Sequence, residues 1–136
     1  MSRWRNLWPG GGSARRRGLK KISYSLFEPA NPPSNEKFVF DKYLLGVYFN
    51  ARMNRLLYPG WQTVVYADER LLERHGSYFA GVAETCGAEA VAFVGRSADR
   101  PLWELVLSRL VPLFDDMTTH LACRDLDSIG TYREAR

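Results

Sequence analysis

Hydrophobic and polar positions alternate along the chain in a pattern that predicts four strands separated by three helices. Short apolar runs rich in β-branched and aromatic residues predict strands at residues 22–27, 62–67, 90–94 and 119–124. Apolar residues at helical spacing predict helices at residues 38–57, 69–86 and 102–113. Strands that alternate with helices imply right-handed crossovers and a largely parallel sheet. The predicted class is therefore α/β, with a Rossmann-like three-layer arrangement.

Gly and Pro residues indicate where the predicted helices begin and end. Gly87 follows the second helix, in a position where a positive φ closes a helix. Pro101 suits the first turn of the third helix, and Pro112 predicts its last turn because it cannot continue the hydrogen-bond ladder. In a parallel sheet of this kind ligands bind outside the carboxyl ends of the strands. The residues that come directly after the strands are therefore the first place to search for chemistry.

Basic residues are concentrated at the N-terminus. The first 21 residues include seven Arg and Lys and no acidic residue, whereas the rest of the chain has 12 basic and 15 acidic residues. Residues 1–18 lack periodicity, and we interpret them as a disordered basic tail that precedes one domain at residues 19–136. Because that domain is mildly acidic, the charge distribution argues against a nucleic-acid-binding protein.

Several other classes of site find no support in the sequence. No apolar run reaches the roughly eighteen residues of a membrane helix, and no secretory h-region is visible, so we expect no transmembrane segment and a cytoplasmic location. Cys86 and Cys123 lie in apolar surroundings and are predicted to be buried free thiols. His75 and His120 do not complete a zinc-binding spacing with them, and His75 is expected at the edge of the core.

The strongest candidate for chemistry follows the fourth predicted strand, where Asp125 and Asp127 flank Leu126. In an extended chain the two carboxylates point to one side and Leu126 points to the other. Carboxylate oxygens are hard ligands that suit Mg²⁺ or Mn²⁺, and these ions commonly bridge to phosphate oxygens. The pair therefore predicts a divalent metal site at the edge of the sheet.

Two other interpretations of the acidic pair remain open. A haloacid-dehalogenase-type phosphatase also places Asp-x-Asp after an apolar strand, although that motif opens its domain, whereas here it lies near residue 136. A structural interpretation makes Arg124, Asp125 and Asp127 a charged exit from the strand, with Ser128 as a cap for the next turn of the chain. A four-residue pattern alone does not separate these interpretations.

A series of segments in a fixed order adds context to the pair. They are Tyr58-Pro59-Gly60-Trp61, Val64-Val65-Tyr66-Ala67-Asp68, Arg109-Leu110-Val111-Pro112-Leu113, Cys123-Arg124-Asp125-Leu126-Asp127-Ser128 and Tyr132-Arg133-Glu134. The series resembles the nucleotide-binding half of GT-A-type glycosyltransferases, particularly polysaccharide-type members with an Arg-Asp-x-Asp-Ser signature. The resemblance extends over residues 20–136, and the Arg-Asp-x-Asp-Ser segment is its most specific part.

The resemblance implies a nucleotide-sugar-binding domain whose partners are a nucleotide-diphosphate sugar and a glycan or other hydroxyl acceptor. It places Asp125 towards the ribose or sugar as part of a Mn²⁺ or Mg²⁺ site, and it makes Asp127 the direct metal ligand. Arg109 or Arg124 would donate to the donor phosphates. The acceptor-binding half of the family has no counterpart in these residues, and no catalytic base is evident. We therefore expect a donor-binding part with a sheet edge open to self-association, or a non-catalytic remnant or interaction domain of the same fold.

Overall fold

The computed structural model describes residues 19–27, 36–97 and 99–126, so the predicted tail at residues 1–18 and the motif residues from Asp127 onward lie outside it. Within these residues four strands form one sheet: β1 (Leu19–Leu26), β2 (Trp61–Asp68), β3 (Val91–Arg96) and β4 (Thr118–Cys123). The strand order is β3-β2-β1-β4, and every neighbouring pair is parallel. The predicted parallel sheet is therefore confirmed.

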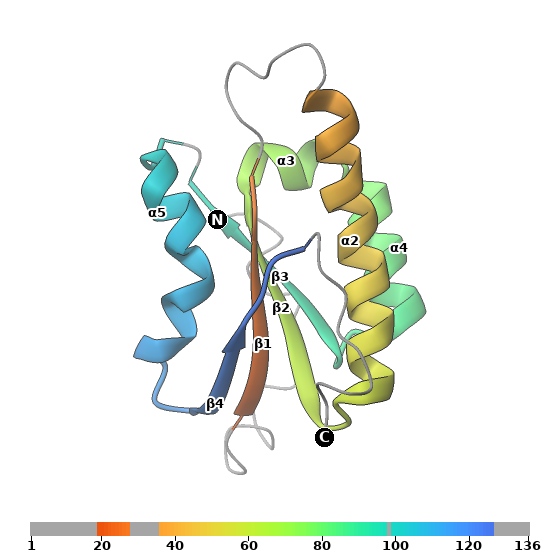
Figure 1. The fold of residues 1–136 in the computed structure, drawn as a ribbon, viewed down its shortest axis with the longest axis vertical. Coiled ribbons are helices and arrows are strands. Elements are labelled where there is room, and N and C mark those ends of the chain that lie inside the picture. The colour runs from red at the N-terminus through yellow and green to blue at the C-terminus, as the bar shows by residue number, and fades with distance from the viewer. Residues whose placement is uncertain (1–18, 28–35, 98, 127–136) are drawn as a thin grey trace.

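Helices cover both faces of the sheet and complete a three-layer α/β arrangement of the Rossmann type (Figure 1). One face is covered by α2 (Glu36–Leu57), α3 (Glu69–Arg74) and α4 (Gly76–Cys86). The other face is covered by α5 (Leu102–Val106) and the 3-10 helix η2 (Leu107–Phe114). The predicted fold class is confirmed in this form.

The strand order reverses at β1, and this reversal identifies the part of the sheet where a ligand is expected. From β1 the chain moves outward to β2 and β3, and it then returns to the other side of β1 to form β4. Ile22 of β1 consequently pairs with Thr63 on one side and with Ala122 on the other. In open α/β sheets the crevice at such a reversal, outside the carboxyl ends of the strands, is the usual ligand position. Here it lies where β1 and β4 end.

The main core lies between the sheet and the α2–α4 layer. Phe79 of α4 and Phe93 of β3 are fully buried and their rings are 5.0 Å apart. Because side chains alternate along a strand, Ile22, Tyr24 and Leu26 of β1 all face this layer. Burial of apolar surface on this scale is the dominant favourable contribution to folding.

The prediction of one helix at residues 69–86 is wrong, because α3 and α4 are separate helices. His75 stands between them with φ −109° and ψ 28°, well away from helical values. Gly76, a weak helix former, follows immediately. The apolar periodicity continues through this point, so it did not indicate the change of direction. His75 is partly buried beside Phe79, as predicted for the edge of the core.

The third predicted helix also differs in kind, because only Leu102–Val106 is α-helical and the following turns form the 3-10 helix η2. Pro112 lacks an N–H group, and its ring is incompatible with the α-helical carbonyl of Ser108. The segment ends at Phe114, and the N–H of Asp115 donates to the Pro112 carbonyl at 3.1 Å. The expected position of Pro112 in the last turn is thus confirmed, and Gly87 closes α4 with a φ of 95°.

Candidate functional site

The acidic segment leaves the sheet at the end of β4, beside the end of β1. The N–H of Arg124 donates to the carbonyl of Ser23 at 3.1 Å and continues the pairing of the two strands for one more residue. Asp125 and Leu126 come next and complete the described part of the predicted motif, since Asp127 lies outside the described residues. The segment therefore begins at the reversal point of the sheet.

The side chains of this segment alternate as the sequence predicts. Leu126 is 3% exposed and packs in the core beneath α2, whereas the Asp125 side chain is 67% exposed. Leu126 thus faces the layer of α2, α3 and α4, and Asp125 faces η2. Burial of Leu126 fixes the side to which Asp125 points.

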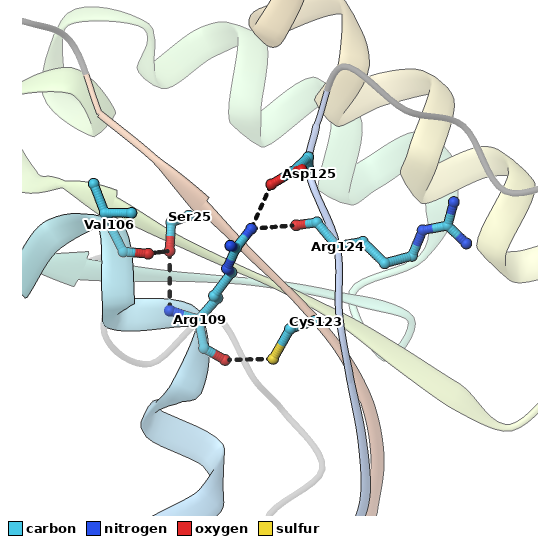
Figure 2. A network of polar contacts seen from close by, with 6 residues as sticks. All are labelled: Ser25, Val106, Arg109, Cys123, Arg124 and Asp125. Atoms are coloured by element: carbon cyan, nitrogen blue, oxygen red, sulfur yellow. Dashed lines mark hydrogen bonds and ion pairs between the residues drawn. The ribbon is translucent and has the colours of Figure 1, made fainter.

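Asp125 is paired with Arg109 of η2. The Nη1 group of Arg109 donates to Asp125 Oδ1 at 2.5 Å and to the carbonyl of Arg124 at 3.4 Å (Figure 2). The Arg109 side chain is 30% exposed, so the pair is accessible from solvent while most of the arginine packs against protein. Two of the predicted site residues, far apart in sequence, therefore meet at the end of β4.

Ser25 of β1 attaches η2 to the sheet at this point. Its hydroxyl donates to the Val106 carbonyl and accepts the N–H of Arg109, both at 2.9 Å. The two bonds hold the junction of α5 and η2 over the carboxyl end of β1, and they bring the Arg109 backbone to the site (Figure 2). Ser25 was not among the site residues predicted from the sequence. Its place on β1, two residues before the predicted strand end, was the available signal.

Arg124 contributes its backbone to the pair, but its side chain lies elsewhere. Figure 2 shows the Arg124 guanidinium pointing away from Arg109 and Asp125, on the opposite side of the segment. This direction is the one that strand alternation requires, because Arg124 shares the side of Leu126. The structure brings Arg109 and Asp125 together and does not bring the Arg124 guanidinium to them.

The two cysteines differ in environment. Cys86 is buried, as predicted, and burial raises the pKa of its thiol. Cys123 is exposed, and the prediction of a buried thiol is wrong there because β4 is an outer strand of the described sheet. Its Sγ donates to the Arg109 carbonyl at 3.5 Å, and partial burial raises its pKa against the opposing effect of Arg109.

Two further polar features lie on the η2 side of the sheet. Lys21 at the start of β1 forms a 2.9 Å ion pair with Asp115. Partial burial works to raise the pKa of Asp115, but the hydrogen bonds it accepts from Met117, Lys21 and Thr118 outweigh burial, and its pKa is lowered. Tyr66 of β2 is buried, and its burial raises its pKa to about 12. This layer therefore contains an ion pair between charged side chains, whereas the core of the opposite layer consists mainly of apolar side chains.

The acidic segment is held from its other side by two residues of α2, Gly46 and Asn50, that the sequence analysis missed. The Asn50 Nδ2 group donates to the Leu126 carbonyl at 3.1 Å, and α2 passes close to the segment at Gly46. The available signal was an Asn within the buried stripe of the helix, three residues after Val47.

The carboxylate of Asp125 suits a divalent metal site in which the protein supplies only one or two ligands. Across residues 19–27, 36–97 and 99–126, no three His, Cys, Asp or Glu side chains gather closely enough to hold a metal ion. Mg²⁺ is commonly bound by one or two carboxylates, several waters and the phosphates of a substrate. Asp125, with its solvent-exposed carboxylate, fits such a site as one of those ligands.

Comparisons with known proteins identify no relationship. No protein-family model matches the chain, and no curated protein and no solved structure matches it. In the part of the chain that the structure describes, no helix is both long and apolar enough to cross a membrane.

Proposed function

We propose that this chain is the donor-binding part of a metal-dependent glycosyltransferase that transfers a sugar from a nucleotide-diphosphate sugar to an acceptor hydroxyl. The observation that supports this proposal most directly is the Arg109–Asp125 pair at the carboxyl ends of β1 and β4. This is the reversal point of a parallel sheet, where nucleotide ligands bind in folds of this type. The Arg-Asp-x-Asp-Ser segment contributes the pair's carboxylate.

The two partners of the pair suit the two charges of a metal–diphosphate complex. A guanidinium matches the geometry of phosphate oxygens, and a carboxylate is a hard ligand for Mg²⁺ or Mn²⁺. In the described structure each partner neutralises the other. A bound donor would replace this contact, with Arg109 turning to the phosphates and Asp125 to the metal, joined by Asp127.

The chain's own groups would orient the donor. Ser25 holds the backbone of Arg109 over β1, and the side chain of Leu126, buried in the core, anchors the segment next to Asp125. Departure of a nucleoside diphosphate builds negative charge on the β-phosphate, and a bound metal would neutralise it as a Lewis acid. Arg109 would add a positive charge to the same phosphates. Fixed groups of this kind stabilise developing charge without having to reorganise during the reaction.

The proposal is tested by nucleotide binding with and without metal. The thermal stability of the purified chain would be measured with UDP or GDP, each in the presence and absence of Mn²⁺. We expect one nucleotide with Mn²⁺ to stabilise the protein, by about 2.7 kcal/mol at a hundredfold excess over its Kd. Asp125→Asn and Asp127→Ala should abolish the effect. Asp116→Asn is the matched control, because Asp116 is an exposed acidic residue at the opposite end of β4.

Three results would contradict the proposal. A folded protein that neither nucleotide stabilises, with or without metal, would favour an interaction domain without a donor site. Hydrolysis of phosphomonoesters through a phosphorylated Asp125 would favour the phosphatase interpretation. If the Asp116→Asn control lost as much nucleotide binding as Asp125→Asn, the nucleotide would not be bound specifically at the Arg109–Asp125 pair.

A further inference from the structure

The segment that carries Asp125 is held by a contact between its backbone and α2. Leu126 is buried beneath the helix, and its carbonyl oxygen lies where a side chain at position 46 would be. A Cβ atom built on Gly46 would stand 2.0 Å from that oxygen, which is less than any real contact allows. Only glycine at this position permits the present approach of the segment to the helix.

Asn50 uses its whole amide group at this contact. Its Nδ2 group donates to the carbonyl of Gly46 at 2.8 Å and to that of Leu126 at 3.1 Å. Its Oδ1 accepts the hydroxyl hydrogen of Tyr24 at 3.3 Å. Asn50 is completely buried, so each of these bonds offsets the cost of removing a polar group from water.

A second asparagine one helical turn away provides a comparison. Asn54 is also buried, and its Nδ2 group donates to Tyr24 at 2.9 Å and to Thr63 at 3.0 Å. Both asparagines therefore belong to one network that joins α2 to the sheet. Only the bonds of Asn50 include the acidic segment.

We propose that Asn50, with the space left by Gly46, is a positioning residue that sets the direction of Asp125. This inference rests on the proposed function, because it assigns Asn50 a role in the same donor site. By holding the Leu126 carbonyl on the α2 side, Asn50 fixes the peptide unit that follows Leu126. Together with the buried Leu126 side chain, this keeps the preceding residue, Asp125, with its carboxylate on the side of Arg109. Polar groups that orient metal ligands from behind commonly change metal affinity or activity by about 10- to 100-fold when removed.

The contact also accounts for an amide in a mainly apolar helix face. A leucine at position 50 would fill a similar volume without needing partners. A leucine, however, leaves the Leu126 carbonyl buried without this donor, and the segment would turn to find another. The specific effect of Asn50 is thus the direction of the segment.

The first experiment compares Asn50→Leu with Asn54→Leu. Each substitution removes one amide from the same network, so both should lower the urea midpoint of unfolding by a similar amount. Asn50→Leu should weaken binding of the Mn²⁺–UDP or Mn²⁺–GDP complex by about tenfold or more. Asn54→Leu should leave this affinity nearly unchanged. Equal weakening by both variants would overturn the proposal, because the effect would then come from general loss of packing.

A second pair of variants protects the test against a failure of Asn50→Leu to fold. Gly46→Ala introduces the clash with the Leu126 carbonyl, whereas the matched Gly81→Ala in α4 meets no atom within 4 Å. Gly46→Ala should reduce nucleotide–metal affinity by about tenfold or more, and Gly81→Ala should not. Unchanged affinity in Gly46→Ala would contradict the proposed role of this contact.

The backbone amide NMR signals of Asp125 and Arg109 separate this inference from the proposed function. Asn50→Leu and Gly46→Ala should shift both signals without any ligand, and Asn54→Leu and Gly81→Ala should leave them in place. If the unaltered protein binds neither complex, the proposed function fails, and the shifts alone decide whether Asn50 positions Asp125. If the signals do not move in Asn50→Leu, the positioning role is wrong whatever the protein binds.

Discussion

The two faces of the sheet differ in what holds them to their helices, and β1 shows the difference within one strand. Ile22, Tyr24 and Leu26 point into the apolar core beneath α2 and α4. The alternate residues, on the other side of the strand, include Lys21, paired with Asp115, and Ser25, bonded to the backbone of η2. One layer is therefore joined mainly by apolar burial, and the other has bonds and charges at both ends of the strand.

Because of this difference, the two layers should respond differently to pH and to bound ions. Apolar burial depends little on pH or on bound ions, whereas the contacts of ionisable groups depend on both. The acidic segment stands between the two layers, with Leu126 in the first and Asp125 in the second. Substitutions of the apolar side chains in the first layer should lower stability under all conditions, and substitutions of the ionisable side chains in the second should have effects that vary with pH or ligand.

The largest expected effect is in the apolar layer. Phe79→Ala removes a fully buried ring that packs on Phe93, and it should lower the free energy of unfolding by about 3–5 kcal/mol. Leu113→Ala on η2 is the comparison, because Leu113 is 65% exposed. It should change stability by no more than about 0.5 kcal/mol. Urea unfolding measures both, and similar losses would mean that the η2 layer has a hidden apolar contribution.

A smaller and pH-dependent effect is expected at Tyr66. Its pKa is raised to about 12 in the folded chain by burial, against about 10 in an unfolded chain. The unfolded chain therefore loses this proton first, and the wild-type protein should lose stability between pH 10 and pH 12. Relative to Tyr66→Phe, which cannot ionise, the loss should reach up to roughly 3 kcal/mol. Parallel stability curves for the two proteins across that range would show that the hydroxyl ionises without cost in the fold.

The smallest effect is expected at the Lys21–Asp115 pair. The pKa of Asp115 is lowered on folding, so its carboxylate stabilises the fold above its ordinary pKa, and that contribution is lost as pH falls through the folded value. Asp115→Asn should cost at most about 1 kcal/mol at pH 7, because the Asp115 side chain is 37% exposed and screened by water. The difference from wild type should shrink below pH 4, as measured by urea unfolding at several pH values. A difference that persists at pH 2 would contradict an electrostatic origin and indicate that the loss comes from hydrogen bonds that asparagine, with one acceptor oxygen, cannot accept from Met117, Lys21 and Thr118.

The strands and the parallel sheet could be predicted because the spacing of apolar residues reports which side of an element is buried. Asn50 and Asn54 were missed because the same spacing counts only apolar residues, although both lie on the buried face of α2. Pro112 was recognised as a stop, but its effect extended backward and made the preceding turns a 3-10 helix. Local sequence signals of this kind predict where a helix ends better than they predict which type of helix forms.

In the candidate site, too, some features could be predicted from the sequence and others could not. The alternation of Asp125 and Leu126 could be predicted from the strand period, and that period also implied that Arg124 points away from Asp125, an implication that the sequence analysis did not draw. The pairing of Arg109 with Asp125 depends on how η2 lies over β1, which Ser25 fixes through its hydroxyl. No pattern within either segment contains that information.

The most direct test of the donor-site proposal is to locate Mn²⁺ by NMR in the presence of UDP or GDP. Mn²⁺ broadens nearby amide signals, and the effect falls steeply with distance. We predict strong broadening at Ser25, Arg109 and Asp125, and little at Thr118 at the other end of β4, roughly 23 Å from Asp125 along the extended chain, or at Asp116, two residues before Thr118. Broadening that centres on Asp116, or that spreads evenly over the chain, would contradict a donor site at the carboxyl ends of β1 and β4.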